Sequence, residues 1–91
     1  MKTVDMKPFE EHFTALERAY FEKNARLNIV AYMIDSDIFT KEQYDKVFND
    51  YVESLKNYEN QISDFENNVV MPVCGMVTWR ADFKQRVIYI E

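Results

Sequence analysis

The chain has 91 residues, enough for one domain with a single hydrophobic core. Hydrophobic residues make up 47% and aromatic residues 15%, a composition that excludes an intrinsically disordered chain. One Gly and two Pro leave few places for turns, which excludes an all-β sandwich or barrel and favours a few long elements. The net charge of −5 offers no general attraction for phosphate backbones, so we do not expect direct nucleic-acid binding.

The N-terminal residues 1–7 are expected to form a flexible arm, and a first helix is predicted over 8–35. Pro8 suits the first helical turn, where its missing N–H costs nothing. Apolar side chains then recur at alternating steps of four and three residues, the spacing of one face of a helix. The eight positions of this stripe, seven of them apolar, are Phe9, Phe13, Leu16, Tyr20, Lys23, Leu27, Val30 and Ile34.

A second helix is predicted over 40–68. Thr40 followed by Gln43 forms a capping box, in which each side chain bonds to the other residue's backbone N–H. The pair Asn67-Asn68 is expected to end this helix. Its stripe repeats the spacing of the first helix at Tyr44, Phe48, Tyr51, Leu55, Tyr58, Ile62, Phe65 and Val69.

The C-terminal part of the chain changes its pattern. Residues 71–75 are expected to be extended or turning, because Pro72 disfavours a helical conformation of the residue before it. A β-hairpin is predicted over 76–90 from two runs of β-branched and aromatic residues. A two-stranded ribbon is marginal alone in water, so it must lie on the helices, pair with a second copy or join a partner's sheet.

These elements define one domain over residues 1–91. Short connections between helices make antiparallel neighbours, so the two stripes are expected to face each other. The predicted fold class is mainly α (α+β), with a long antiparallel αα-hairpin followed by a C-terminal β-hairpin. We also expect it to dimerise as a helical bundle, for the reason that follows.

The segment 29–34 is apolar on every side of the first helix, and the β-hairpin starts at the opposite end of the helices. A helix that is apolar all round is normally buried. We therefore expect a second surface that binds another protein chain, most simply a second copy in a homodimer. The candidate partner-binding residues are Phe21, Ile29, Tyr32, Met33 and Ile38, with Trp79 and Phe83 on the hairpin.

No catalytic, metal-binding or cofactor-binding residues are predicted. His12 and Cys74 are the only members of their types, too few to close a zinc site alone. A Cys–His nucleophilic pair is the third hypothesis, but one glycine leaves little freedom to build an oxyanion loop. That glycine also excludes a glycine-rich phosphate loop, so no nucleotide cofactor is expected.

The lone cysteine excludes an intrachain disulfide and favours a reducing compartment. The N-terminal residues lack the apolar stretch of a secretory signal, and no apolar run reaches membrane-spanning length. We therefore expect a cytoplasmic protein with no membrane association. The preferred function is a small acidic, non-enzymatic protein–protein interaction module that binds a partner or itself through the apolar turn-end patch, the β-hairpin edge or both. The alternative is an inhibitor that blocks a nucleic-acid-binding complex with its acidic surface, since this composition resembles phage and mobile-element inhibitors such as anti-CRISPR proteins.

Overall fold

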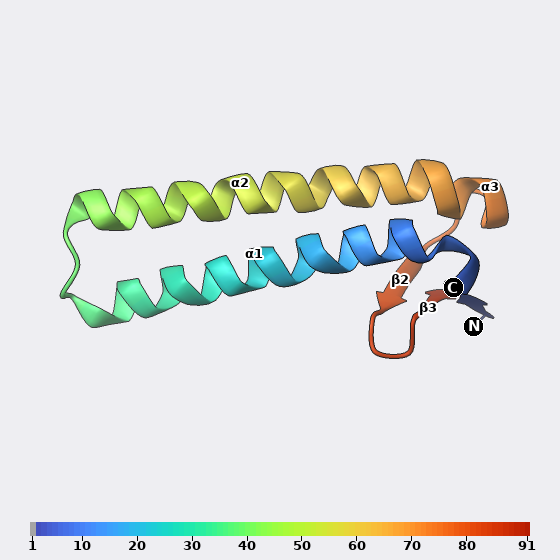
Figure 1. Cartoon of the computed structure of the whole chain (residues 1–91), viewed down its shortest axis with the longest axis horizontal. Coiled ribbons are helices and arrows are strands. Elements are labelled where there is room, and N and C mark those ends of the chain that lie inside the picture. The colour runs from blue at the N-terminus through green and yellow to red at the C-terminus, as the bar shows by residue number, and fades with distance from the viewer. Residues whose placement is uncertain (1) are drawn as a thin grey trace.

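The computed structural model describes residues 2–91 as a long helical hairpin with a small sheet at one end (Figure 1). Helix α1 spans Glu10–Ser36, after a 3-10 turn η1 over Lys7–Phe9, and helix α2 spans Lys41–Phe65. The two helices run antiparallel, which confirms the predicted αα-hairpin. The molecule measures 48 × 21 × 21 Å, so it is an elongated rod.

The connection between the helices is short and capped on both sides. Asp37 ends α1 in the left-handed conformation with φ 54°, which aspartate tolerates better than most residues. The capping box predicted for the second helix is confirmed. The Gln43 N–H donates to the Thr40 hydroxyl at 3.2 Å, and the Thr40 N–H donates to the Gln43 side-chain carbonyl at 2.9 Å.

The predicted end of the second helix at residue 68 is wrong, because the chain stays helical as far as Cys74. A π-helical turn, η2, spans Glu66–Val70, and a final turn, α3, spans Met71–Cys74. A proline in a regular helix collides with the carbonyl four residues earlier. The wider π turn directly before Pro72 relieves that collision, and the Met71 N–H donates to the carbonyl five residues back.

The sheet has three antiparallel strands in the order β1-β3-β2. Strand β2 spans Trp79–Asp82, β3 spans Val87–Ile90, and β1 spans Lys2–Asp5. The prediction that residues 1–7 form a flexible arm is therefore wrong over the described part of that segment, and residue 1 lies outside it. Strand β1 is ordered because β3 supplies ladder hydrogen bonds and Val4 packs against the core.

Arg86 helps to hold the hairpin turn against α1. Arg86 adopts φ 56°, a left-handed conformation that is costly for a side chain of this size. Its guanidinium donates to the Thr14 hydroxyl at 3.0 Å and pairs with Glu17 at 3.4 Å. The same group lies 5.1 Å from the centre of the Phe13 ring. These contacts offset the strained backbone and fix the hairpin on the helix.

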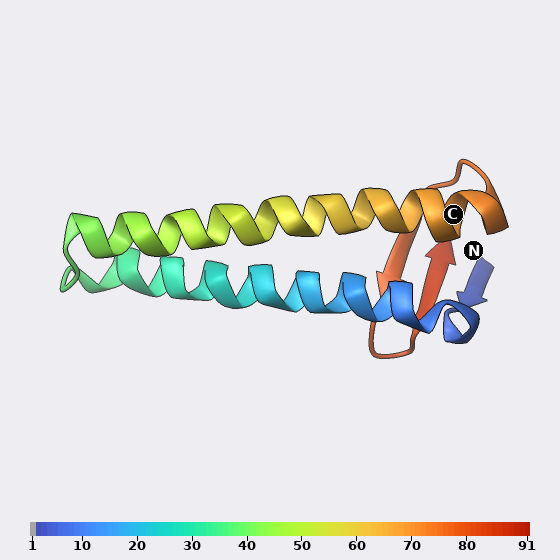
Figure 2. The ribbon, with the colours of Figure 1, turned by 45° about the horizontal axis from the view of Figure 1, so that its top comes forward.

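The main core lies where the two helices meet the sheet, a region that we call the base end (Figure 2). Of the three supports that the sequence left open for the hairpin, the structure shows the first, because the sheet packs on the helices. The hairpin also gains β1 as a third strand, and three strands on a helical layer are stable where two alone are not. The base-end core consists of Met6, Phe13, Leu16, Phe65, Val69, Val70, Ile88 and Ile90.

Candidate functional site

The opposite extremity of the hairpin, which we call the turn end, consists of the last turns of α1, the connection and the first turns of α2. Here only two α1 side chains are well buried, Val30 at 5% exposure and Met33 at 7%. Leu27 and Ile34 belong to the predicted inward stripe, yet they are 42% and 61% exposed. The turn end therefore leaves large apolar side chains in contact with solvent.

The reason is the short reach of the sheet. Leu27 and Ile34 continue the line of Phe13 and Tyr20, each seven residues further along α1. At the base end that line is covered by Phe83 of the hairpin, whose ring lies 5.2 Å from Phe13 and 5.1 Å from Tyr20. Beyond the hairpin, α1 has only α2 as a neighbour, so this side of the helix stays bare (Figure 1).

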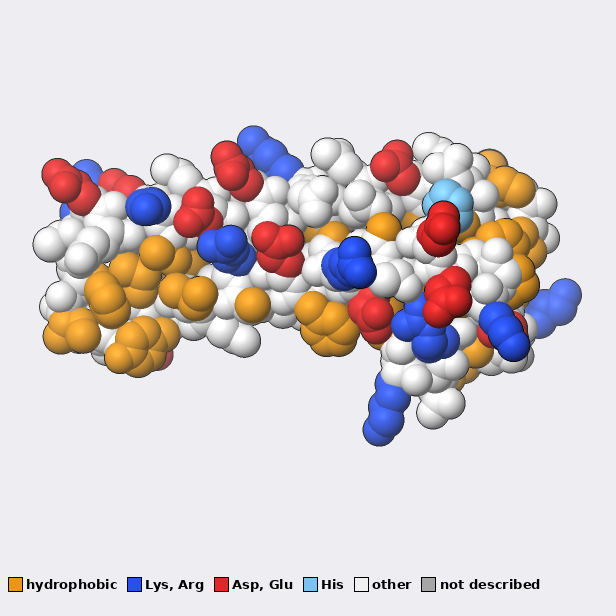
Figure 3. Space-filling view, in the orientation of Figure 1, with side chains coloured by type: hydrophobic (Ala, Val, Ile, Leu, Met, Phe, Trp, Pro, Cys, Tyr) orange, Lys and Arg blue, Asp and Glu red, His pale blue; other side chains and the backbone are white. Residues whose placement is uncertain are grey.

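An open groove of about 430 Å³ crosses the turn end between α1 and α2. Tyr32 and Phe39 meet edge-on at one side of it, with ring centres 6.0 Å apart. Figure 3 shows hydrophobic side chains gathered along α1 at this extremity, on the face turned to the viewer. The groove is lined by Ile29, Tyr32, Met33, Phe39, Gln43, Lys46 and Val47, which we call the turn-end surface.

Four of the predicted partner-binding residues fall at this extremity. Ile29 and Tyr32 are exposed and line the groove, and Ile38 is exposed in the connection. The prediction that Met33 lies outside the intramolecular contact is wrong, because Met33 is buried within the chain and shows only an edge to the groove. The stripe assigned an inward position to Ile34. In the structure Met33 takes that position, because Val30 and Met33 lie on the side of α1 that faces α2.

The other three predicted partner-binding residues lie toward the base end. The half-exposed Phe21 ring contacts Phe83 and Tyr20, with ring centres 6.0 and 5.4 Å away. Trp79 packs on Phe65 at 5.1 Å. Phe83 and Trp79 therefore hold the sheet on the helices, and their rings contribute mainly to the chain's own packing.

Four residues of the groove were not predicted from the sequence, the polar Gln43 and Lys46 and the apolar Phe39 and Val47. Phe39 precedes the cap of α2, where a hydrophobic residue normally packs on the helix that it introduces. Val47 lies beside the apolar stripe of α2 and not on it. The position of Val47 off the stripe could have identified it, because apolar residues off the stripe of the first helix identified Ile29 and Tyr32.

A polar waist separates the turn end from the base-end core. Lys23 is half-buried there, with its ammonium 5.1 Å from the Tyr20 ring centre and 5.0 Å from that of Tyr58, and it donates to Asn24 at 2.9 Å. Burial raises the pKa of the Tyr58 hydroxyl above its usual 10.0, and the neighbouring Tyr20 raises it further. The Lys23 stem thus packs between the helices while its charge rests on aromatic faces.

His12 and Cys74 occupy different settings. His12 is exposed near the start of α1, and Cys74 is a half-buried free thiol that packs against the base-end core. No hydrogen bond joins their side chains in residues 2–91. Within the same residues, no three His, Cys, Asp or Glu side chains are grouped so as to hold a metal ion.

The charged side chains are mixed in sign over the face shown in Figure 3, where acidic groups alternate with Lys and Arg along the upper helix. At the waist Arg26 pairs with Glu22 of its own helix at 3.9 Å and with Asp50 of α2 at 3.6 Å. Such interspersed charges are typical of a solvated surface. On this face they do not form the continuous acidic patch that an inhibitor of a basic cleft requires.

None of the helices within residues 2–91 combines the length and apolar character needed to span a bilayer. The geometry thus singles out the turn-end surface as the candidate site, an apolar groove with two polar side chains on its rim. Comparison with known proteins adds no relative, since no family model, curated protein or solved structure matches this chain.

Proposed function

We propose that this chain is a non-enzymatic protein–protein interaction module that binds another protein chain through the turn-end surface. The observation that carries the proposal is the exposure of Ile29, Tyr32 and Ile38 around a groove whose lining is largely apolar. Contiguous apolar patches on soluble proteins mark interaction sites, because leaving them in water costs free energy. The free thiol of Cys74 supports a cytoplasmic location as part of the same proposal.

The size of the exposed surface supports a second copy as the bound partner. A monomer of 11.0 kDa is expected to expose roughly 5600 Å², whereas this chain exposes 6539 Å². The surplus, about 900 Å², reflects the elongated shape of the rod, and it is large enough to supply the ~800 Å² that each partner buries in an interface of standard size. Two turn ends packed about a two-fold axis form a short four-helix bundle, which covers both grooves at once.

Light scattering coupled to size exclusion tests this proposal. The wild-type chain is expected at twice the 11.0 kDa chain mass. Ile29→Glu and Tyr32→Glu are expected to give monomers, because each places a charge in the apolar contact. Met33 is unsuitable for this test, since it is buried within the chain and its replacement also destabilises the fold.

The matched control is Met76→Glu, which puts the same charge on a side chain that is 89% exposed beyond the far end of α2. This variant is expected to remain a dimer. A wild-type monomer at every concentration measured, or a dimer that survives both turn-end substitutions, would contradict the proposal. Loss of the dimer in high salt with no effect of the substitutions would support the alternative of charge-driven binding.

A further inference from the structure

Strand β2 lies at one edge of the sheet, and its backbone has a free side. The Glu91 N–H donates to the Thr78 carbonyl at 3.0 Å, so residue 78 directs its backbone groups toward β3. In an antiparallel pair this direction alternates from one residue to the next. The N–H and C=O groups of Trp79 and Ala81 therefore point away from β3, toward the unpaired edge.

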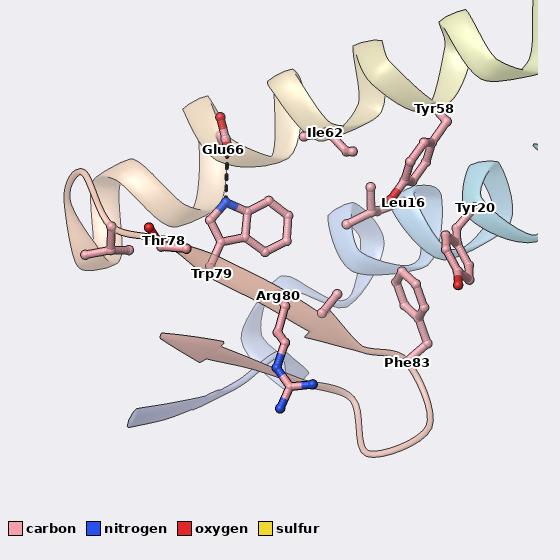
Figure 4. A pocket seen from close by; sticks show the side chains of 11 residues that line it. Leu16, Tyr20, Tyr58, Ile62, Glu66, Thr78, Trp79, Arg80 and Phe83 are labelled. Atoms are coloured by element: carbon pink, nitrogen blue, oxygen red, sulfur yellow. Dashed lines mark hydrogen bonds between the residues drawn. The ribbon is translucent and has the colours of Figure 1, made fainter. Parts of the chain in front are cut away.

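A second groove runs along that edge. It has a volume of about 560 Å³ and lies between β2 and the two helices (Figure 4). Five consecutive residues, 77–81, border it on the sheet side. Opposite them are Leu16, Tyr20, Tyr58 and Ile62 of the helices, and the rings of Trp79 and Phe83 complete the apolar lining from the hairpin.

The groove is held open by a fixed side chain. The Trp79 ring points toward the helices, and its indole N–H donates to the Glu66 carboxylate at 2.9 Å, as the dashed line in Figure 4 shows. The ring also packs on Phe65. With both contacts in place the indole does not rotate across the edge, so the free backbone groups of β2 remain accessible beside an apolar wall.

Two cations lie near this edge, Lys23 on the side of the helices and Arg80 on the outer face of β2 (Figure 4). The Lys23 ammonium lies over two of the lining rings, those of Tyr20 and Tyr58, and the Arg80 guanidinium stacks 4.7 Å from the Tyr89 ring centre. Among the ion pairs of residues 2–91, neither cation has a carboxylate partner. The groove itself is apolar apart from the Glu66 carboxylate that accepts from Trp79, whereas Arg80 offers a cation to a carboxylate on the outer face of an added strand.

From this juxtaposition we infer that the free edge of β2 binds an extended acidic peptide segment of another protein. The peptide adds to the sheet as a fourth strand, bonded to the backbone of Trp79 and Ala81, and alternate apolar side chains enter the aromatic groove. Its alternate carboxylates then lie on the outer face of the sheet, near Arg80. The other free edge, β1, carries charged Lys2 and Asp5 at its ends, a feature that discourages strand addition.

The probe for this inference is a short, terminally blocked peptide of alternating leucine and aspartate, labelled with fluorescein. Its binding to the full chain is followed by fluorescence anisotropy, and its position by amide chemical shifts in NMR spectra. We expect saturable binding, with the largest shifts at residues 77–81. A peptide with N-methyl groups on alternate backbone nitrogens keeps the side chains but loses the strand-forming donors, and it is expected to bind at least roughly tenfold more weakly.

The protein variant that tests the edge is Ala81→Pro. Proline removes the N–H that points outward and leaves the ladder to β3 intact, the one setting in which a sheet tolerates it. We expect binding weakened roughly tenfold. Arg80→Glu, on an exposed side chain, provides a second variant that does not depend on the strand accepting proline, and it is expected to weaken binding of the acidic probe severalfold.

Tyr32→Glu is the control, because it disrupts the turn-end surface and leaves this groove untouched, so its affinity for the probe should equal that of the wild type. The inference is overturned if the N-methylated peptide binds as well as its parent, if the shifts map to the turn end, or if no saturation is reached. A dimer that Ala81→Pro dissociates would also overturn it, since the edge would then be occupied by a second copy.

Discussion

The base end and the turn end are built from the same two helices but differ in what covers them. At the base end a three-stranded sheet adds a third side to the contact, and eight side chains form a continuous core. At the turn end each helix has one neighbour, and α1 buries only Val30 and Met33 well. A pair of helices encloses little volume, so a helix that is apolar all round needs another layer of the same chain or of a partner.

The largest effect is expected at the base end, from Phe13→Ala. Phe13 is fully buried and packs on the rings of Phe65 and Phe83, 6.1 and 5.2 Å away. Its loss is expected to reduce the free energy of unfolding by about 3–5 kcal/mol, a large part of the stability of a small domain. Urea denaturation measures this quantity.

The matched substitution at the turn end is Ile34→Ala, at a side chain that is 61% exposed. It is expected to change the free energy of unfolding by no more than about 0.5 kcal/mol. Both substitutions belong in the Tyr32→Glu background, so that dimerisation does not contribute. Similar losses at Phe13 and Ile34 would break the contrast between the two ends.

An effect between those of Phe13→Ala and Ile34→Ala is expected from Thr40→Ala, which removes the cap of α2. Without the hydroxyl, the Gln43 N–H loses its partner, and we expect a loss of about 1 kcal/mol in the free energy of unfolding. Hydrogen exchange should show faster opening at the first turn of α2 and unchanged protection in the base-end core. Ser63→Ala, an exposed hydroxyl further along α2, is the control, and an equal effect there would argue against a specific role of the cap.

The smallest effect concerns the polar waist between the two ends. The raised pKa of Tyr58 means that the folded state favours the protonated hydroxyl more than the unfolded state does. Its contribution to stability is therefore complete below pH 10.0 and is lost as the pH rises through the folded-state pKa. Tyr58→Phe should flatten the decline of stability in alkaline solution, and an unchanged pH profile from urea titrations would show that Tyr58 does not contribute.

The helices were predictable because their signals are local. The spacing of the stripes and the Thr40-Gln43 pair lie within a few residues of what they determine. Strand β1 was not predictable, since Lys2–Asp5 offers only Val4 as an apolar signal and its partner β3 lies at the other end of the sequence. The helical turns around Pro72 were not predictable either. Pro72 locally disfavours a helix at the residue before it, but packing of Val69 and Val70 in the base-end core outweighs that preference.

The turn-end site was partly predictable for the same reason. Off-stripe apolar residues identified Ile29 and Tyr32, but a stripe alone does not say which of its flanks the sheet will cover. Ile34 and Met33 were therefore assigned to the wrong sides. The groove beside β2 was beyond prediction, because it depends on how far the hairpin stands from α2 and on the Trp79–Glu66 hydrogen bond.

The pairing of Lys2 with Ile90 also bears on the order of folding. The helices and their connection need contacts only between nearby parts of the chain, while closing β1 on β3 brings together segments from opposite ends of the sequence. We therefore expect the hairpin of helices to assemble before β1 pairs with β3. Fluorescent labels near residues 2 and 90 should report that last step alone, since these residues become neighbours only when it is complete (Figure 2).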